Sequence, residues 1–126
     1  MKKVTEKHFQ YFKLRCQAWA ERIGLGDWQI YHRKLPLDGC FAEASCQSTD
    51  HIATISLNSR WDDSVRPLDE DELDRTAAHE CLHIAIAEIG ALARARYVSK
   101  EEIQEREEAT VVRLQRAILG GSNGSW

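Results

Sequence analysis

The chain has 126 residues, of which 43% are hydrophobic and 29% charged, as in ordinary globular proteins. This length fits one domain whose core needs no disulfides, and the composition excludes a chain that is disordered as a whole. The net charge of −3 provides no general attraction for a polyanion, so we do not expect nucleic acid as a partner.

Membrane insertion is also not expected, because no apolar run approaches the roughly 18 residues that a membrane span requires. The first seven residues are charged and lack the apolar stretch of a signal peptide. We therefore expect a cytoplasmic protein with no membrane partner.

The first element in chain order is an amphipathic helix predicted over residues 5–23. Its apolar positions are three or four residues apart and form one stripe, namely Phe9, Phe12, Cys16, Trp19 and Ile23. Thr5 fits the N-cap, and the turn that begins at Gly24 ends the helix.

Three short strands are predicted next, over residues 28–32, 41–47 and 52–57, where the sequence alternates or is rich in β-branched residues. Asp38-Gly39 and Ser48-Thr49-Asp50 supply the turns. Because these connections are too short for crossover helices, the expected arrangement is a three-stranded antiparallel meander.

Two further helices complete the predicted α+β domain over residues 1–119. One begins at the N-cap Asp69 and runs to at least residue 89, ending at Gly90 or continuing to about Arg96. The other has Ser99 as N-cap and reaches about residue 119, after which the glycine-rich residues 120–126 are predicted to be a flexible tail.

The central motif is the H-E-x-x-H sequence at His79, Glu80 and His83. On a helix the two histidines lie about 40° apart, so both imidazoles can bind one metal ion. Glu80 lies beside that ion, as a base acting on a metal-activated water must. A metal would also offset the cost of three ionisable groups in an otherwise apolar helix. The alternative interpretation is a pair of hydrogen-bonded core histidines.

A catalytic zinc ion needs a third protein ligand, and the candidates are the glutamates of the last helix. Ile103, Val111, Leu114 and Ile118 predict an inward apolar stripe in which Glu107 occupies one position. Glu107 is therefore the expected third ligand. Glu108, at the edge of the same stripe, is the second candidate.

The order of helix, small sheet, H-E-x-x-H helix and glutamate-bearing helix resembles the minimal gluzincins, the zincin-like fold of the SprT-like and ImmA/IrrE-type families. It is most similar to small metallopeptidases encoded by bacteriophages. The shared features cover residues 5–119: Phe12, Cys16 and Trp19 in the first helix, Gly24, Leu25 and Trp28 after it, the histidine motif, and a late Glu before a Val-x-x-Leu stripe. The Ala-Asn pair of the ImmA-type pattern is absent.

This resemblance implies a zinc-dependent peptidase acting on a protein or peptide, with His79, His83 and Glu107 as Zn²⁺ ligands and Glu80 as catalytic acid/base. For a phage protein the compartment would be the host cytoplasm. Zincins generally hold substrate as an added strand, and residues 52–57 are the expected sheet edge. Tyr97, His51 and Arg96 are candidates for stabilising the oxyanion.

A non-catalytic alternative is a metal-binding scaffold or interaction protein, such as a phage assembly component. The charge distribution is compatible with such docking, since residues 1–22 hold six Lys and Arg against two Glu, whereas residues 62–88 hold nine Asp and Glu against two Arg.

Overall fold

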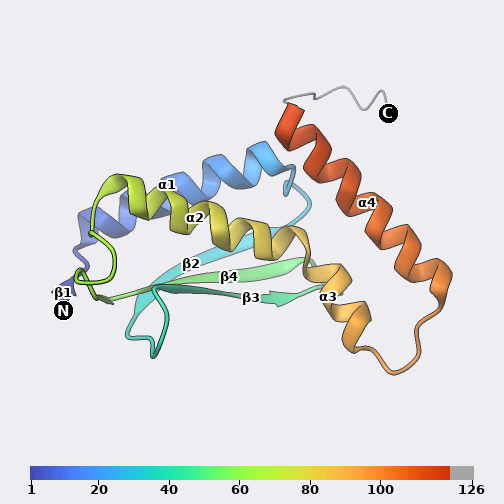
Figure 1. Ribbon diagram of the computed structural model, residues 1–126, viewed down its shortest axis with the longest axis horizontal. Helices are drawn as coiled ribbons and strands as arrows, with labels where there is room; N and C mark the ends of the chain where they lie inside the picture. Colours follow the sequence, from blue (N-terminus) through green and yellow to red (C-terminus); the bar gives the residue numbers. More distant parts are fainter. Residues whose placement is uncertain (120–126) are drawn as a thin grey trace.

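The computed structural model describes residues 1–119 and is α+β, as predicted (Figure 1). The predicted tail lies outside the described residues. The elements in chain order are β1 (Lys2–Lys3), α1 (Glu6–Ile23), β2 (Gln29–Leu35), β3 (Ala42–Gln47), β4 (Ile52–Asn58), β5 (Arg60–Trp61), α2 (Glu70–Ala85), α3 (Ala87–Arg94) and α4 (Lys100–Leu119).

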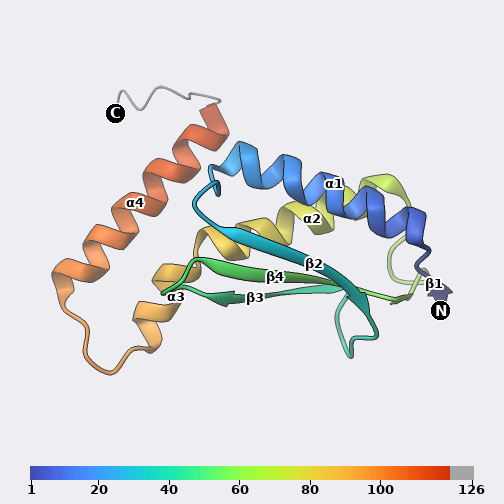
Figure 2. The ribbon, with the colours of Figure 1, turned by 180° about the vertical axis from the view of Figure 1, so that it is seen from behind.

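Two layers make up the body of the molecule. Helices α1 and α2 lie side by side on one face of the sheet of β2, β3 and β4, as both ribbon views show (Figure 2). α3 continues beyond α2, and α4 returns toward the end of α1. None of the helices within residues 1–119 combines the length and the apolarity needed to cross a lipid bilayer.

The three predicted helix starts and the predicted end of α1 are confirmed, because each depends on a local hydrogen bond that the sequence specifies. The Thr5 side chain accepts a hydrogen bond from the backbone N–H of His8, and Gly24 ends α1 in the left-handed region at φ 84°. Asp69 accepts from the N–H of Glu72 at 2.9 Å, and Ser99 caps α4. The predicted long helix is instead divided at Ile86, where φ is −102° and ψ is 4°, while Gly90 lies within α3.

The sheet is not the predicted antiparallel meander. Its order is β2-β4-β3, with β2 parallel and β3 antiparallel to β4. The connection from β2 to β3 therefore passes over the end of β4 without pairing the two strands. Consequently residues 52–57 belong to the central strand, and their predicted role as a substrate-binding edge is wrong.

The side chain of Asn58 organises this connection. Asn58 is 5% exposed, and its amide donates to the carbonyl oxygens of Leu37 and Cys40, both at 2.9 Å. Its Oδ1 accepts from the N–H groups of Leu37 at 3.1 Å and Arg60 at 3.0 Å. One buried amide thus satisfies three backbone groups of the β2–β3 loop and the backbone N–H of Arg60 at the start of β5.

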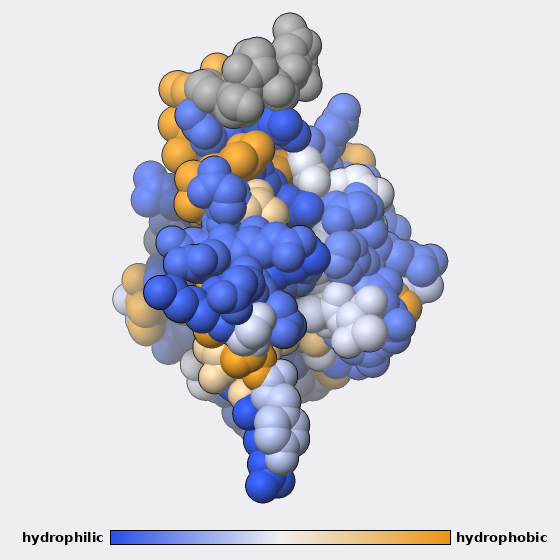
Figure 3. Space-filling view, turned by 90° about the vertical axis from the view of Figure 1, so that its right-hand side faces the viewer, coloured by the Kyte–Doolittle hydropathy of each residue, from blue (hydrophilic) through white to orange (hydrophobic). Residues whose placement is uncertain are grey.

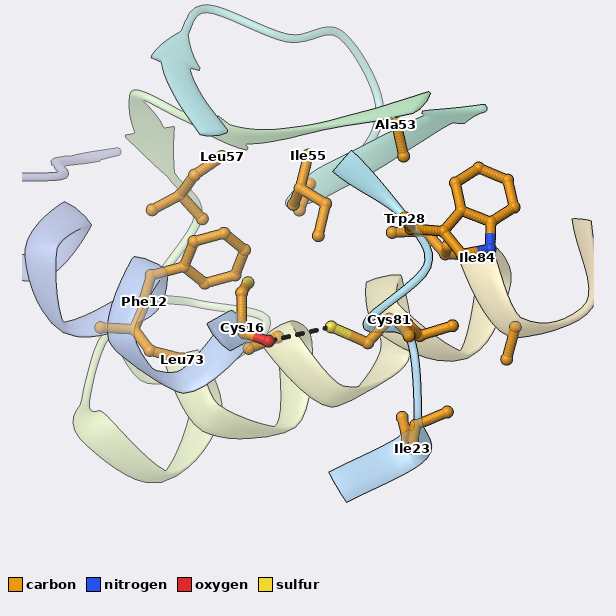
Figure 4. Close-up of a cluster of buried hydrophobic side chains, with 14 of the residues drawn as sticks. Phe12, Cys16, Ile23, Trp28, Ala53, Ile55, Leu57, Leu73, Cys81 and Ile84 are labelled. Atoms are coloured by element: carbon orange, nitrogen blue, oxygen red, sulfur yellow. Dashed lines mark hydrogen bonds between the residues drawn. The ribbon is translucent and has the colours of Figure 1, made fainter. Parts of the chain in front are cut away.

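The core lies between the two layers (Figure 4). Alternate residues of β4 point toward the helices, where Phe12 and Leu73 are also fully enclosed. The Cys81 thiol donates to the carbonyl oxygen of Cys16 at 3.4 Å, which joins α2 to α1. A side-chain contact with Cys81, followed by burial, raises the pKa of the Cys16 thiol well above the usual range, so this thiol stays protonated.

An ionic contact at the rim of the core fixes α2 against α1. Arg15 and Trp19 both donate to Asp74 Oδ1, at 2.6 and 2.8 Å. Partial burial raises the pKa of Asp74, but these two hydrogen bonds outweigh it and hold that pKa below its usual value. The position of α2, and hence of the histidine motif, depends on this clamp.

Candidate metal centre

The two histidines of the motif lie on the solvent-exposed side of α2. His79 and His83 are one helical turn apart, and their Nε2 atoms are 3.2 Å from each other. The rings meet edge to face, with centroids 4.8 Å apart and an interplanar angle of 79°. Both Nε2 atoms therefore point toward the same small region outside the helix.

This separation suits a shared metal ion. A tetrahedral zinc ion about 2.0–2.1 Å from each of two ring nitrogens keeps those nitrogens about 3.3–3.4 Å apart. The observed 3.2 Å differs from that value by little more than 0.1 Å, so the spacing of the two nitrogens is compatible with one shared ion. A hydrogen bond between two neutral imidazoles also fits this distance.

Glu80 points inward from the same turn of α2 and is 5% exposed. Burial raises the pKa of its carboxyl, the two neighbouring histidines lower it, and Glu43 on β3 raises it further, with a net upward shift. A buried carboxyl with an elevated pKa suits a general base near neutral pH. The structure therefore places a buried carboxyl next to a pair of histidines whose Nε2 atoms are close together.

A hollow of about 480 Å³ adjoins the motif. Its walls come from α2, from the start of β3 with the two residues before it, and from the β5–α2 connection. The lining residues are Glu72, Arg75, Thr76, His79, Glu80, Cys40, Phe41, Ala42 and Arg66. The sequence interpretation missed this site, although Arg75 precedes His79 by four residues and so shares its helix face. A ligand in the hollow would contact both the histidine and the candidate base.

The free edge beside this hollow belongs to β3. Among residues 1–119, β3 is the outer strand of its sheet and no strand pairs with its outward edge. α2 packs against β3, and Ala42 at the start of the strand lines the hollow. An extended peptide paired with this edge would pass along the face of the H-E-x-x-H helix.

The predicted inward stripe of α4 is largely exposed. Ile103, Val111 and Ile118 are 39%, 50% and 77% exposed, and Glu107 is also on the exposed side. Leu114 is the member of this stripe that packs against the core, and it does so beside Ala117, so the packed face of α4 is offset from the predicted stripe.

Polar contacts explain that offset. Arg106 binds Glu88 at 2.8 Å, and Arg113 lies 3.3 Å from Asp27, so two arginines occupy positions that a purely apolar stripe would not include. Within the described residues, no group of three or more His, Cys, Asp or Glu side chains is arranged to hold a metal ion. The structure therefore brings His79, Glu80 and His83 together but does not bring Glu107 or Glu108 to them.

The three residues predicted as candidates for stabilising an oxyanion are His51, Tyr97 and Arg96, and none of them lines the hollow beside the histidine motif. The His51 ring stacks on Trp28 with centroids 4.8 Å apart, and its two nitrogens contact Asp27 at 3.0 Å and Glu88 at 2.7 Å. Tyr97 is 84% exposed between α3 and α4, and the Arg96 guanidinium lies 5.5 Å from its ring centroid. Through these contacts His51 joins the β3–β4 turn to α3, which is a structural role.

Comparison of the chain with protein-family models, with characterised proteins and with solved structures finds no match.

Proposed function

We propose that this protein is a zinc-dependent peptidase with a zincin-like fold that hydrolyses peptide bonds in a protein or peptide substrate. The observation that carries the proposal is the juxtaposition of Glu80, a buried carboxyl with an elevated pKa, with two histidine Nε2 atoms 3.2 Å apart. The adjoining hollow and the free edge of β3 give a peptide access to both.

In this proposal His79 and His83 hold the zinc ion. When bound, zinc supplies Lewis-acid polarisation of the scissile carbonyl and acidifies the attacking water. Glu80 takes a proton from that water at its carboxylate and later delivers it to the departing amine. The upward shift of the Glu80 pKa, caused mainly by burial, favours both steps, because it makes the carboxylate a stronger base than an exposed Glu.

The third ligand is proposed to come from α4, with Glu107 favoured and Glu108 as the alternative. For either carboxylate to bind the same ion as His79 and His83, α4 must approach α2 more closely than it does in this structure. α4 is fastened at two points by the pairs Arg106–Glu88 and Arg113–Asp27, both of which are partly solvent-exposed. Such pairs contribute little each, about 0–1 kcal/mol, so a bound metal ion could outweigh them.

The test compares zinc-loaded parent protein with Glu80→Gln on a degenerate peptide library read by mass spectrometry. Gln keeps the shape of the side chain but cannot accept the proton. We expect one equivalent of zinc in both proteins and cleavage in the parent alone. Equal cleavage by both would contradict the role of Glu80, and zinc binding without cleavage by either would contradict the peptidase proposal.

A second candidate function is a non-catalytic metal-binding scaffold or interaction protein. It is favoured by the apolar side chains that α4 exposes, including Val111 at 50%, Ile118 at 77% and Leu119 at 63%. Figure 3 shows orange apolar patches within a mostly hydrophilic face on this side of the molecule. Such residues are common where a partner docks. A zinc site with no position left for water would favour this candidate over the peptidase.

A further inference from the structure

The hollow beside His79 and Glu80 carries two arginines that no carboxylate of the described residues pairs with. The arginines that do form salt bridges within residues 1–119 are Arg15, Arg106 and Arg113. Arg66 and Arg75 instead line the hollow, one on each side of the space between the β5–α2 connection and α2. Unpaired guanidinium groups facing a concave site are suited to bind an anionic group of a ligand.

Arg66 is held in position by aromatic packing. Its guanidinium lies 5.1 Å from the centroid of the Phe41 ring, and that ring packs against Trp61 at 4.4 Å with a tilt of 50°. Trp61 is fully buried, and its indole N–H donates to the carbonyl oxygen of Arg66 at 2.9 Å. The guanidinium of Arg66 is therefore held in place by groups that pack on the core. This reduces the side-chain entropy that Arg66 loses when it binds a ligand.

The charge balance of the hollow limits the size of the anion. Glu72 also lines it, so apart from Glu80 two positive groups stand against one negative group. Outside the hollow, residues 62–74 contain six further acids, namely Asp62, Asp63, Asp69, Glu70, Asp71 and Asp74. These acids would repel a polyanion. A ligand with a single carboxylate is repelled less and can reach Arg66 and Arg75.

We propose that Arg66 and Arg75 form a carboxylate-binding subsite, so that the substrates of this protein carry an acidic side chain or a free C-terminus next to the bond that is cleaved. This inference rests on the proposed peptidase function for its cleavage site, but carboxylate binding itself does not. Of the two arginines, Arg75 is nearer in sequence to the proposed metal ligand His79, which follows it by one turn of α2. Glu72 opposes the same carboxylate.

The test measures binding without hydrolysis. The probes are four fluorescein-labelled decapeptide pools, with Glu or Gln fixed at one position and with a free or an amidated C-terminus. Fluorescence anisotropy is measured with zinc-loaded Glu80→Gln, which lacks the proposed base, and cleavage of the same pools by the zinc-loaded parent is measured separately by mass spectrometry. We expect the carboxylate-bearing pools to bind about tenfold more tightly than the neutral pool, a typical gain for one charge-assisted contact. If the Glu pools bind more tightly than the Gln pools, the subsite recognises an acidic side chain. If the pools with a free C-terminus bind more tightly than the amidated pools, it recognises the C-terminal carboxylate.

Three variants determine whether the hollow is responsible. Arg75→Glu should abolish the preference for the carboxylate-bearing pools or reverse it toward the neutral pool, and Glu72→Gln should strengthen it. Arg22→Glu is the matched control, because Arg22 lies on α1 over the Trp19 ring and outside the hollow, and it should leave the preference unchanged. Circular dichroism of each variant verifies that the fold is retained.

Failure of this inference is distinct from failure of the peptidase proposal. Cleavage with no preference for acidic peptides, in binding or in products, overturns the subsite and leaves the peptidase. A carboxylate preference that depends on Arg75, without any cleavage by the parent, supports the subsite and overturns the peptidase. A preference equally reduced by Arg22→Glu would show general charge attraction and would overturn the subsite.

Discussion

Replacement of Asn58 by Ala should destabilise the protein strongly, because one side chain satisfies four backbone groups. The carbonyl oxygens of Leu37 and Cys40 and the N–H groups of Leu37 and Arg60 would all lose their partner. A buried group left without a hydrogen bond costs about 1–3 kcal/mol, and water can reach part of this loop. We therefore expect a loss of about 3 kcal/mol in the free energy of unfolding.

Urea unfolding followed by tryptophan fluorescence measures this loss. With a slope of about 2 kcal/mol/M, the midpoint should fall by about 1.5 M without a change in slope. Asn58→Asp retains the acceptor but cannot donate to the two carbonyls, so it should also be destabilising. Ser45→Ala, on the exposed face of β3, is the control and should change stability by less than about 0.5 kcal/mol. A loss below about 1 kcal/mol for Asn58→Ala would refute the role assigned to this side chain.

Two further predictions concern the clamp under the motif and the third ligand. Because the pKa of Asp74 is lowered in the folded state, its contribution to stability is present above the ordinary pKa of Asp and is lost as the pH falls through the lowered value. Asp74→Asn should therefore cost about 1 kcal/mol at about pH 7, and urea midpoints of variant and parent should converge toward about pH 3; a constant difference would contradict this. Glu107→Gln should weaken zinc binding at least about tenfold in a competition titration with a chromophoric chelator, whereas Glu108→Gln should change it less than about threefold. The opposite order would make Glu108 the ligand, and no effect of either would exclude both.

Local chemistry explains which parts of the fold the sequence could predict. The caps Thr5, Asp69 and Ser99 are each satisfied by a backbone group within the next three residues, so the helix starts follow from short stretches of sequence. The pairing of His79 with His83 follows equally from helix geometry, because both residues belong to one turn of α2.

The incorrect predictions concern contacts between distant segments. The strand order depends on Asn58 binding a loop about twenty residues earlier, and no local pattern marks an asparagine as such an organiser. The orientation of α4 depends on Arg106 and Arg113 reaching Glu88 and Asp27. These long charged side chains lie on the face of α4 that packs against the body. The spacing of the apolar residues in α4 therefore predicted the wrong face as the buried one.

The central claim is that His79 and His83 bind a zinc ion on which Glu80 acts, and a crystal structure of the protein with added zinc tests it most directly. We predict an ion about 2.0–2.1 Å from both Nε2 atoms, a carboxylate of α4 as a further ligand, and a water molecule at the remaining position within hydrogen-bond distance of Glu80. A structure in which the two histidines remain hydrogen-bonded to each other, without an ion under saturating zinc, would contradict the account.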